Sequence, residues 1–189
     1  RPMDIILAST SPYRRRLLER LQLSFRCMSP EIEEISLSGE APTAMAQRLA
    51  LLKAESVAQR YPSATVIGSD QVAVIDGSIL GKPGSFDRAR EQLRSSSGRT
   101  VQFYTAVALV GLDRGVKRLH VEPFNVRFRV LNDIQITNYL RRERPYDCAG
   151  SFKIEGLGIA LFEALTGNDP TSLEGLPLIK LTELLTAVG

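Results

Sequence analysis

Apolar residues change their spacing along the opening of the chain, and the changes predict a strand, a helix, a second strand and a second helix. A short apolar run at 4–9 indicates a buried strand, and the leucines of 12–21 recur at helical spacing. A short strand is predicted at 25–28 and an amphipathic helix at 43–60, with an acidic loop at 29–41 between them. This opening is typical of an α/β protein.

The segment 65–75 is apolar except for Gly68-Ser69-Asp70-Gln71 at its middle. We therefore expect a strand that is interrupted there, with Asp70 at a strand end rather than in the core. Asp76-Gly77 directly afterwards is a hairpin signal, because both residue types tolerate the backbone angles of tight turns.

The second half of the chain continues the alternation of helices and strands. The predicted segments are a loop at 81–85, a helix at 86–94, strands at 101–112 and 116–130 joined by a turn at 113–115, a helix at 132–142 capped by Asn132, and a last helix at 178–188. A glycine-spaced segment at 147–170 separates the last two helices. Together these elements predict an α/β fold with a mixed β-sheet flanked by helices, in a single domain spanning 1–189 with a second lobe at about 82–150.

Composition narrows the class of protein. A hydrophobic content of 43% and a charged content of 24% are those of a soluble globular protein, and a net charge of +3 permits an anionic ligand without requiring nucleic acid. Cys27 and Cys148 lack CxxC spacing, which argues against a thiolate zinc site and favours a reducing cytosol. His120 is the only histidine, so a multi-histidine metal site is excluded.

No apolar run reaches transmembrane length, and no secretory signal opens the chain. We therefore expect a cytoplasmic protein with no membrane partner. Met3 is expected to be the natural start, with Arg1 and Pro2 foreign to the protein.

The stretch LASTSPYRRRLLERL places arginines where a helix begins, although cations are unfavourable at a helix N-terminus. Ser11 is a suitable N-cap, and the free backbone N–H groups after it form an anion site. Ser9 adds a hydroxyl and Arg14 a guanidinium fork that matches phosphate oxygens. A bound polyphosphate would explain the arginines; the alternative is a solvated basic turn in which Arg15 pairs with Glu19.

Carboxylates form a second candidate group. Asp70 beside Gly68 could activate water or hold a hard cation, and Glu34 could ligate the same cation. Since nitrogen and sulfur ligands are scarce, the expected metal is Mg²⁺ or Mn²⁺. The alternative is a capping aspartate and a solvated acidic loop that also carries Glu31 and Glu33.

Two lysines could complete a phosphate site. Lys82 lies at the tip of the loop Gly81-Lys82-Pro83, and Lys53 lies inside the predicted helix at 43–60. Both could instead be ordinary surface lysines. With Arg14 they would supply the cations needed to hydrolyse a phosphoanhydride.

The sequence closely resembles the Maf-like nucleoside triphosphate pyrophosphatases. The motifs LASTSPYRRRLL, EIEE, RLALLKA, IGSDQV, GKP, SGRTVQFYTAVAL, YDCAGSFKIEGLG and GLPL occur in the family's order over nearly the whole chain. The resemblance implies a Maf/ITPase-like fold with two lobes around a substrate cleft. It also implies a house-cleaning activity that converts a nucleoside triphosphate to the monophosphate and pyrophosphate with a divalent cation.

The resemblance also implies roles for individual residues. Asp70 matches the catalytic base, and the residues that match the phosphate, metal and catalytic positions are Ser9, Arg14, Glu34, Lys53 and Lys82. Catalysis is expected from Asp70, Lys82 and Glu34, and metal binding from Glu34 and Asp70. Maf-like proteins often form dimers, so a homodimer is an expected arrangement.

Three positions suggest the substrate. The Maf group acting on dTTP and UTP typically has arginine at Tyr13, threonine at Gln71 and glutamine at Glu155, whereas this chain is similar to the group that prefers 7-methyl-GTP. Glu155 could accept two hydrogen bonds from a guanine edge, while a uracil or thymine edge offers only one donor. Methylation makes the base cationic, and a carboxylate and a tyrosine face both favour a cation.

Three rival functions remain open at the level of sequence. One is a pyrophosphatase acting on dTTP, UTP or another non-standard nucleotide. A different class is a non-catalytic nucleotide- or nucleic-acid-binding regulator, although no specific nucleic acid is expected. A Ser-His hydrolase based on His120 is disfavoured, because LHVEPF predicts a strand and lacks a nucleophile elbow.

Overall fold

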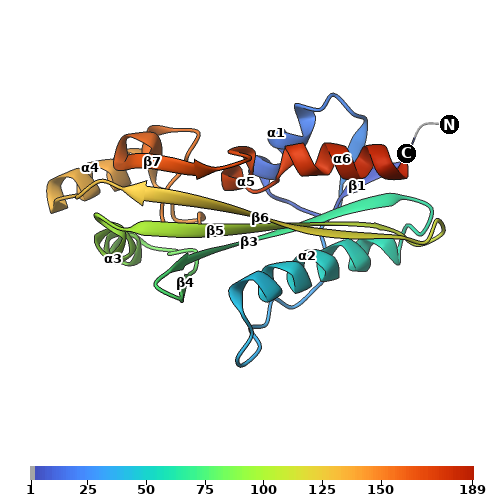
Figure 1. Ribbon diagram of the computed structural model, residues 1–189, viewed down its shortest axis with the longest axis horizontal. Helices are drawn as coiled ribbons and strands as arrows, with labels where there is room; N and C mark the ends of the chain where they lie inside the picture. Colours follow the sequence, from blue (N-terminus) through green and yellow to red (C-terminus); the bar gives the residue numbers. More distant parts are fainter. Residues whose placement is uncertain (1–2) are drawn as a thin grey trace. The chain divides into compact units, whose positions relative to one another are not determined.

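The computed structural model describes residues 3–189, so Arg1 and Pro2, which we expected to be foreign to the protein, lie outside the described residues (Figure 1). The chain divides into two compact units. Unit 1 contains the residues up to Gln71 together with Thr105–Glu122 and Asp169–Gly189, and unit 2 contains Val72–Tyr104 and Pro123–Asn168. The strands β3 (Thr65–Ile75), β5 (Thr100–Gly111) and β6 (Val116–Phe128) contribute to both units.

Unit 1 is built on parallel strands. Strand β1 (Ile5–Leu7) pairs with β2 (Phe25–Cys27) on one side and with the start of β3 on the other, so that Ile5 lies opposite both Phe25 and Thr65. The helices of this unit are α1 (Pro12–Glu19), α2 (Pro42–Ala58), α5 (Thr171–Glu174) and α6 (Leu178–Val188). Helix α2 covers one face of these strands, and α1, α5 and α6 lie over the other (Figure 1).

Hydrophobic burial holds α1 and α6 against the strands of unit 1. Leu17 and Leu18 of α1 and Leu181 of α6 pack with Leu7 and Ile67 of the strands in one buried cluster. Burial of such side chains is worth about 1.5–3 kcal/mol each. The spacing of these leucines therefore determines which face of each helix turns inward.

Unit 2 is mostly antiparallel. Strand β4 (Ser78–Leu80) pairs with the end of β3, and β7 (Phe162–Gly167) pairs with the end of β6. The helical segments are α3 (Phe86–Ser96), α4 (Asp133–Glu143) and the 3₁₀ turn η1 (Leu157–Leu161). Four phenylalanine rings form its centre in edge-to-face contacts, with ring centroids 4.8–5.5 Å apart: Phe103, Phe128, Phe152 and Phe162.

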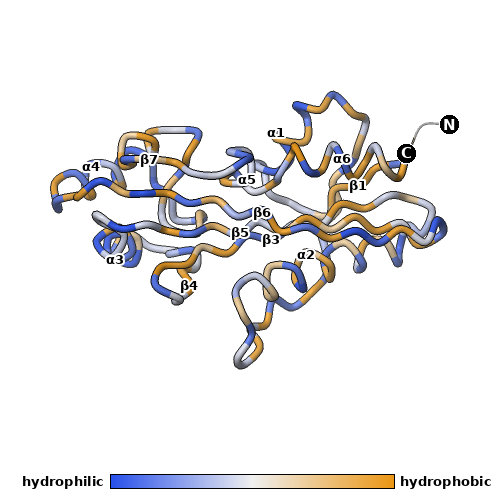
Figure 2. Tube along the Cα trace, viewed as in Figure 1, coloured by the Kyte–Doolittle hydropathy of each residue, from blue (hydrophilic) through white to orange (hydrophobic). Residues whose placement is uncertain are grey.

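Most predicted elements are confirmed. The sheet is mixed, with strand order β2-β1-β3-β5-β6-β7 and β4 paired to β3. Ser11 caps α1, Asn132 caps α4 in a capping box, and the last helix spans the predicted residues. Strand β1 is hydrophobic, whereas α3 is largely hydrophilic (Figure 2). Within residues 3–189 no helix has the length and apolar character needed to cross a membrane.

Two predictions about individual segments are wrong. Strand β3 is continuous from Thr65 to Ile75, so Asp70 lies in mid-strand and not at a strand end. Its carboxylate is tolerated there because it forms an ion pair with Lys53. The glycine-spaced segment at 147–170, to which we assigned no element, contains η1 and β7. Strand β7 has a single buried residue, Phe162, so its sequence carries little hydrophobic signal.

Candidate active site

The site begins with a close approach between strand β3 and helix α2. A Cβ atom on Gly68 would lie 2.1 Å from the backbone oxygen of Ala50 and 2.8 Å from the backbone nitrogen of Ala54. Only glycine leaves room for the helix backbone at this distance. Lys53, which precedes Ala54 in α2, is thereby brought within reach of Asp70 on the same strand.

Lys53 joins two carboxylates. Its Nζ lies 3.0 Å from Oδ1 of Asp70 and 2.8 Å from Oε1 of Glu34, and it donates a weaker hydrogen bond to the backbone oxygen of Ser69 at 3.4 Å. Lys53 is 7% exposed, so the alternative that it is an ordinary surface lysine is wrong. The acidic loop residue Glu34, the helix residue Lys53 and the strand residue Asp70 form one charged cluster in unit 1.

The carboxyl group of Asp70 is electrostatically perturbed. Burial raises its pKa, the nearby charges of Lys53 and Arg14 partly offset this rise, and Glu34 adds to it. A carboxylate with a raised pKa binds a proton more readily than an exposed aspartate does. Asp70 is therefore suited to act as a base toward a bound water molecule.

Arg14 of helix α1 is influenced by the charges of Asp70 and Glu34. The Ser11 hydroxyl caps the helix by accepting from the backbone N–H of Arg14 at 3.3 Å, and Nε of Arg14 donates to the backbone oxygen of Gly175 at 2.8 Å. Burial lowers the pKa of Arg14, and the charges of Asp70 and Glu34 oppose this effect. The guanidinium thus lies near the two carboxylates.

Ser9 and the pair of Arg15 with Glu19 lie at the two ends of the segment around the start of α1. Ser9 is buried after β1, and its Oγ accepts a hydrogen bond from the backbone N–H of Ser11 at 3.0 Å, which leaves the hydroxyl hydrogen to donate elsewhere. The predicted pair is confirmed, since Nε of Arg15 lies 3.3 Å from Oε1 of Glu19.

Tyr13 and Gln71 have well-defined surroundings. The guanidinium of Arg16 lies 5.3 Å from the ring centroid of Tyr13. Nε2 of Gln71 donates to Oγ1 of Thr105 at 3.1 Å and to the backbone oxygen of Ser172 at 2.9 Å. Because side chains alternate along a strand, Gln71 lies on the face of β3 opposite to Asp70. The structure does not bring Gln71 together with the Lys53 cluster.

Lys82 and Glu155 belong to unit 2 and are both exposed. The loop of Lys82 is anchored on each side, since the backbone oxygen of Gly81 accepts from Nε2 of Gln92 and the backbone N–H of Gly84 donates to the backbone oxygen of Tyr146.

The turn that carries Glu155 is tied to helix α4. Oε1 of Glu143 accepts from the backbone N–H of Leu157 at 2.8 Å, and the Tyr139 hydroxyl accepts from the backbone N–H of Lys153 at 2.9 Å. Glu155 is therefore carried on a restrained segment.

Glu34 and Asp70 fit a hard divalent cation only if water or substrate oxygens supply the remaining ligands. Among residues 3–189, no three or more His, Cys, Asp or Glu side chains group in a way that could hold a metal ion. Glu34 and Asp70 nevertheless converge on one positive centre, the Nζ of Lys53. A pair of carboxylates is the protein share typical of Mg²⁺ sites, where water and substrate phosphates complete the shell.

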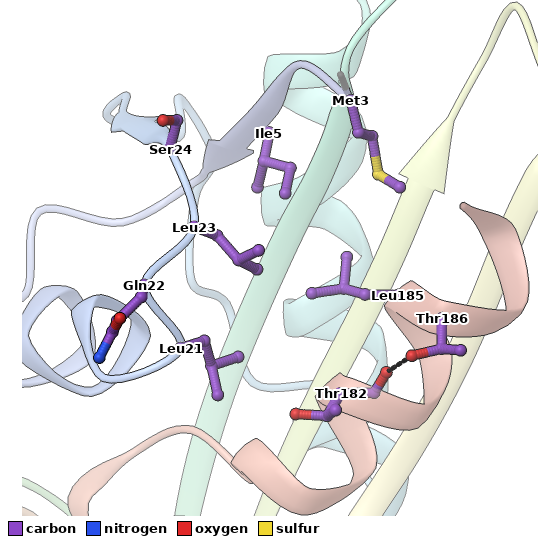
Figure 3. A pocket seen from close by; sticks show the side chains of 9 residues that line it. All are labelled: Met3, Ile5, Leu21, Gln22, Leu23, Ser24, Thr182, Leu185 and Thr186. Carbon is purple, nitrogen blue, oxygen red and sulfur yellow. Dashed lines mark hydrogen bonds between the residues drawn. The ribbon is translucent and has the colours of Figure 1, made fainter. Parts of the chain in front are cut away.

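A separate pocket in unit 1 lacks this chemistry (Figure 3). Its lining is mainly apolar and consists of Met3, Ile5, Leu21, Gln22, Leu23, Ser24, Thr182, Leu185 and Thr186. The hydroxyls of Thr182 and Thr186 donate to backbone oxygens within α6. With no ionisable side chain in its lining, the pocket is unsuited to binding phosphate.

Sequence reasoning missed the residues that position the cluster. Gly68 was noted only as a neighbour of Asp70, although a lone glycine in a strand is a signal of close backbone approach. In the sequence, Gly175 belongs to the motif GLPL, which carries no signal of a contact with Arg14. The carbonyl oxygen of Gly175 accepts from Nε of Arg14 at 2.8 Å and lies 2.8 Å from the Ser69 hydroxyl, which is equally close to the backbone oxygen of Ala106. No local sequence pattern predicts this contact, because Arg14 and Gly175 are 161 positions apart in the chain.

Comparison with known protein sequences gives matches over nearly the whole chain. The family model described as Maf-like protein matches residues 4–188. A protein from a Polaromonas species and one from Nitrosococcus oceani, both named 7-methyl-GTP pyrophosphatase, are each 54% identical to this chain. The alignments cover 98% of this chain and 84% of the first relative, and 100% of this chain and 94% of the second. The solved structure of the Staphylococcus aureus Ham1 protein aligns with 66% of this chain and 71% of its own, at 17% identity and a TM-score of 0.48.

Proposed function

The chain belongs to the Maf-like family, and from this premise we propose that it is a nucleoside triphosphate pyrophosphatase that hydrolyses 7-methyl-GTP to 7-methyl-GMP and pyrophosphate. The observation that carries the reaction type is the buried ion pair of Lys53 with Asp70, extended by Glu34. The observation that favours the substrate is the identity of 54% to two relatives with that printed name.

In the proposed reaction a water oxygen attacks the α-phosphorus and gives its proton to Asp70. The bond between the α-phosphorus and the oxygen that bridges to the β-phosphorus breaks, and pyrophosphate leaves with that oxygen. Lys53 keeps the carboxylate of Asp70 ionised and oriented at 3.0 Å. Arg14, Lys82 and the hydroxyl of Ser9 would stabilise the negative charge on the phosphates.

Glu34 and Asp70 would hold the divalent cation, for which we propose Mg²⁺ or Mn²⁺. When bound, the cation would neutralise charge on the phosphate oxygens. Lys53, held between both carboxylates, would limit their mutual repulsion and keep them convergent. We further propose that residues 1–189 form a single family domain, with the second lobe about 82–150, and that the protein forms a homodimer.

The proposed activity is tested with a nucleotide panel. The protein is incubated with 7-methyl-GTP, GTP, dTTP and UTP in the presence of Mg²⁺ or Mn²⁺, and released pyrophosphate is measured. We expect the highest kcat/KM on 7-methyl-GTP. A preference for dTTP or UTP would contradict the substrate but keep the reaction. The regulator hypothesis would be favoured by tight, strongly salt-dependent RNA binding without any hydrolysis.

Substrate choice has its own prediction, which concerns Glu155. Replacing Glu155 with glutamine removes a charge that would attract the methylated cationic base and replaces one of two acceptors. We expect kcat/KM for 7-methyl-GTP to fall about 10- to 100-fold, and that for UTP to change by less than about threefold. Glu163→Gln, an exposed glutamate of β7 in the same unit, is the matched control. Equal losses on both nucleotides would show that Glu155 serves the fold.

A further inference from the structure

The backbone turn after helix α5 contacts the arginine that is proposed to bind phosphate. Gly175 ends α5 with a φ of +118°, and its carbonyl oxygen accepts from Nε of Arg14 at 2.8 Å. A Cβ atom on Gly175 would lie 3.2 Å from Nε and 3.3 Å from Cγ of Arg14. The two residues are 161 positions apart in the chain, so this contact exists only in the folded protein.

The position of this carbonyl is supported by its neighbours. The Ser69 hydroxyl lies 2.8 Å from the same oxygen, from strand β3 next to Asp70. On the other side, the buried hydroxyl of Thr171 donates to Oδ1 of Asp169 at 2.6 Å and accepts from the backbone N–H of Leu178 at 3.0 Å. The same hydroxyl oxygen lies 3.0 Å from the backbone oxygen of Leu176. The turn at 175–177 is therefore restrained on both sides.

The hydrogen bond to Gly175 uses Nε of the Arg14 guanidinium and leaves the two terminal nitrogens available. Nε is used by Gly175, while the structure gives the two terminal nitrogens of Arg14 no hydrogen bond or ion pair with residues 3–189. Two adjacent N–H donors in one plane match two oxygens of a phosphate.

We propose that Gly175 is a positioning residue that holds Arg14 so that both terminal nitrogens bind the triphosphate end-on. This inference rests on the proposed function, since it refines how that site holds phosphate. Glycine is required for two reasons: the backbone angle is left-handed, and any side chain would press on Arg14. The carbonyl also keeps the desolvated guanidinium hydrogen-bonded before the anion arrives.

The test uses binding of inorganic tripolyphosphate, measured by calorimetry with Mg²⁺ present, so that it does not depend on turnover. We expect Gly175→Ala to weaken binding about 10- to 100-fold. Gly115→Ala is the control, because Gly115 also has a positive φ, of +63°, but has nothing within 4 Å of its Cβ position. This control should bind like the wild type.

A double-mutant cycle separates positioning from a general effect on the fold. In the Arg14→Ala background, Gly175→Ala should cause no further loss of tripolyphosphate binding. An undiminished further loss in that background would overturn the inference, as would a wild-type protein that does not bind tripolyphosphate. A protein that shows the expected binding series but hydrolyses no nucleotide would contradict the proposed function while supporting the role of Gly175.

If Gly175→Ala fails to fold, Arg14→Lys tests the same inference. A lysine has one ammonium group and cannot contact the carbonyl of Gly175 while offering two planar donors to phosphate. We expect this variant to bind tripolyphosphate nearly as weakly as Arg14→Ala. Wild-type affinity in Arg14→Lys would overturn the inference.

Discussion

Replacing Asp70 with asparagine is expected to reduce kcat on 7-methyl-GTP by about 10²- to 10⁴-fold, the usual contribution of a general base. Asparagine preserves the shape of the side chain but cannot take a proton from water. The measurement is steady-state pyrophosphate release by the purified variant. Undiminished turnover would eliminate Asp70 as the base.

The same substitution is expected to remove one pH-dependent contribution to the stability of the protein. The pKa of Asp70 is raised in the folded state, mainly by burial. Between its unfolded and folded pKa values the folded protein binds more protons, so the free energy of unfolding of the wild type falls as pH rises through this window. The asparagine side chain of the variant does not titrate, so the free energy of unfolding of the variant lacks this fall across the window.

This stability difference is measured by urea unfolding at several pH values in buffer with EDTA, which keeps metal from contributing. Asp113→Asn is the matched control, because Asp113 is an exposed residue of the β5–β6 turn in the same unit. That control should change neither turnover nor the pH dependence of unfolding. If the unfolding free energy of Asp70→Asn fell across this window as steeply as that of the wild type, Asp70 would not be the group responsible.

The second large effect that we expect is a loss of stability and turnover in Gly68→Ala. The new Cβ would overlap the backbone of α2, 2.1 Å from the oxygen of Ala50, so the helix must move away from β3. Overpacking of this kind costs about 1–3 kcal/mol of unfolding free energy, and more when backbone must shift. Because the ion pair of Lys53 with Asp70 spans the same contact, we expect turnover to fall as well.

A strand glycine with ordinary space provides the control for this prediction. At Gly111 the nearest atom to an added Cβ is Cβ of Val116 at 3.5 Å, an ordinary contact distance. Gly111→Ala should unfold within about 1 kcal/mol of the wild type and keep its activity. Thermal unfolding and pyrophosphate release on both variants compare the two sites, and equal stability of Gly68→Ala and the wild type would contradict the close-packing argument.

The candidate site was predictable where a residue's type and its local pattern carry the chemistry. Ser11 and Pro12 indicate a helix start, and the basic residues after it indicate an anion. Asp70 stands out as a carboxylate in an otherwise apolar segment, which predicted a strand end there. The pattern could not show that the strand continues through it, because that depends on a cation supplied by another element, Lys53 of α2.

The sequence by itself determined the α/β class, the order of most elements, the helix caps and, through the motifs of the Maf-like family, the residues worth testing. These features depend on neighbours a few positions apart, where spacing, capping and turn chemistry act. The tertiary structure decided that Lys53 is buried between two carboxylates, and that Gly68 and Gly175 bring distant segments into contact. Such contacts join residues far apart in the chain, and only packing of the folded backbone brings them within hydrogen-bonding distance.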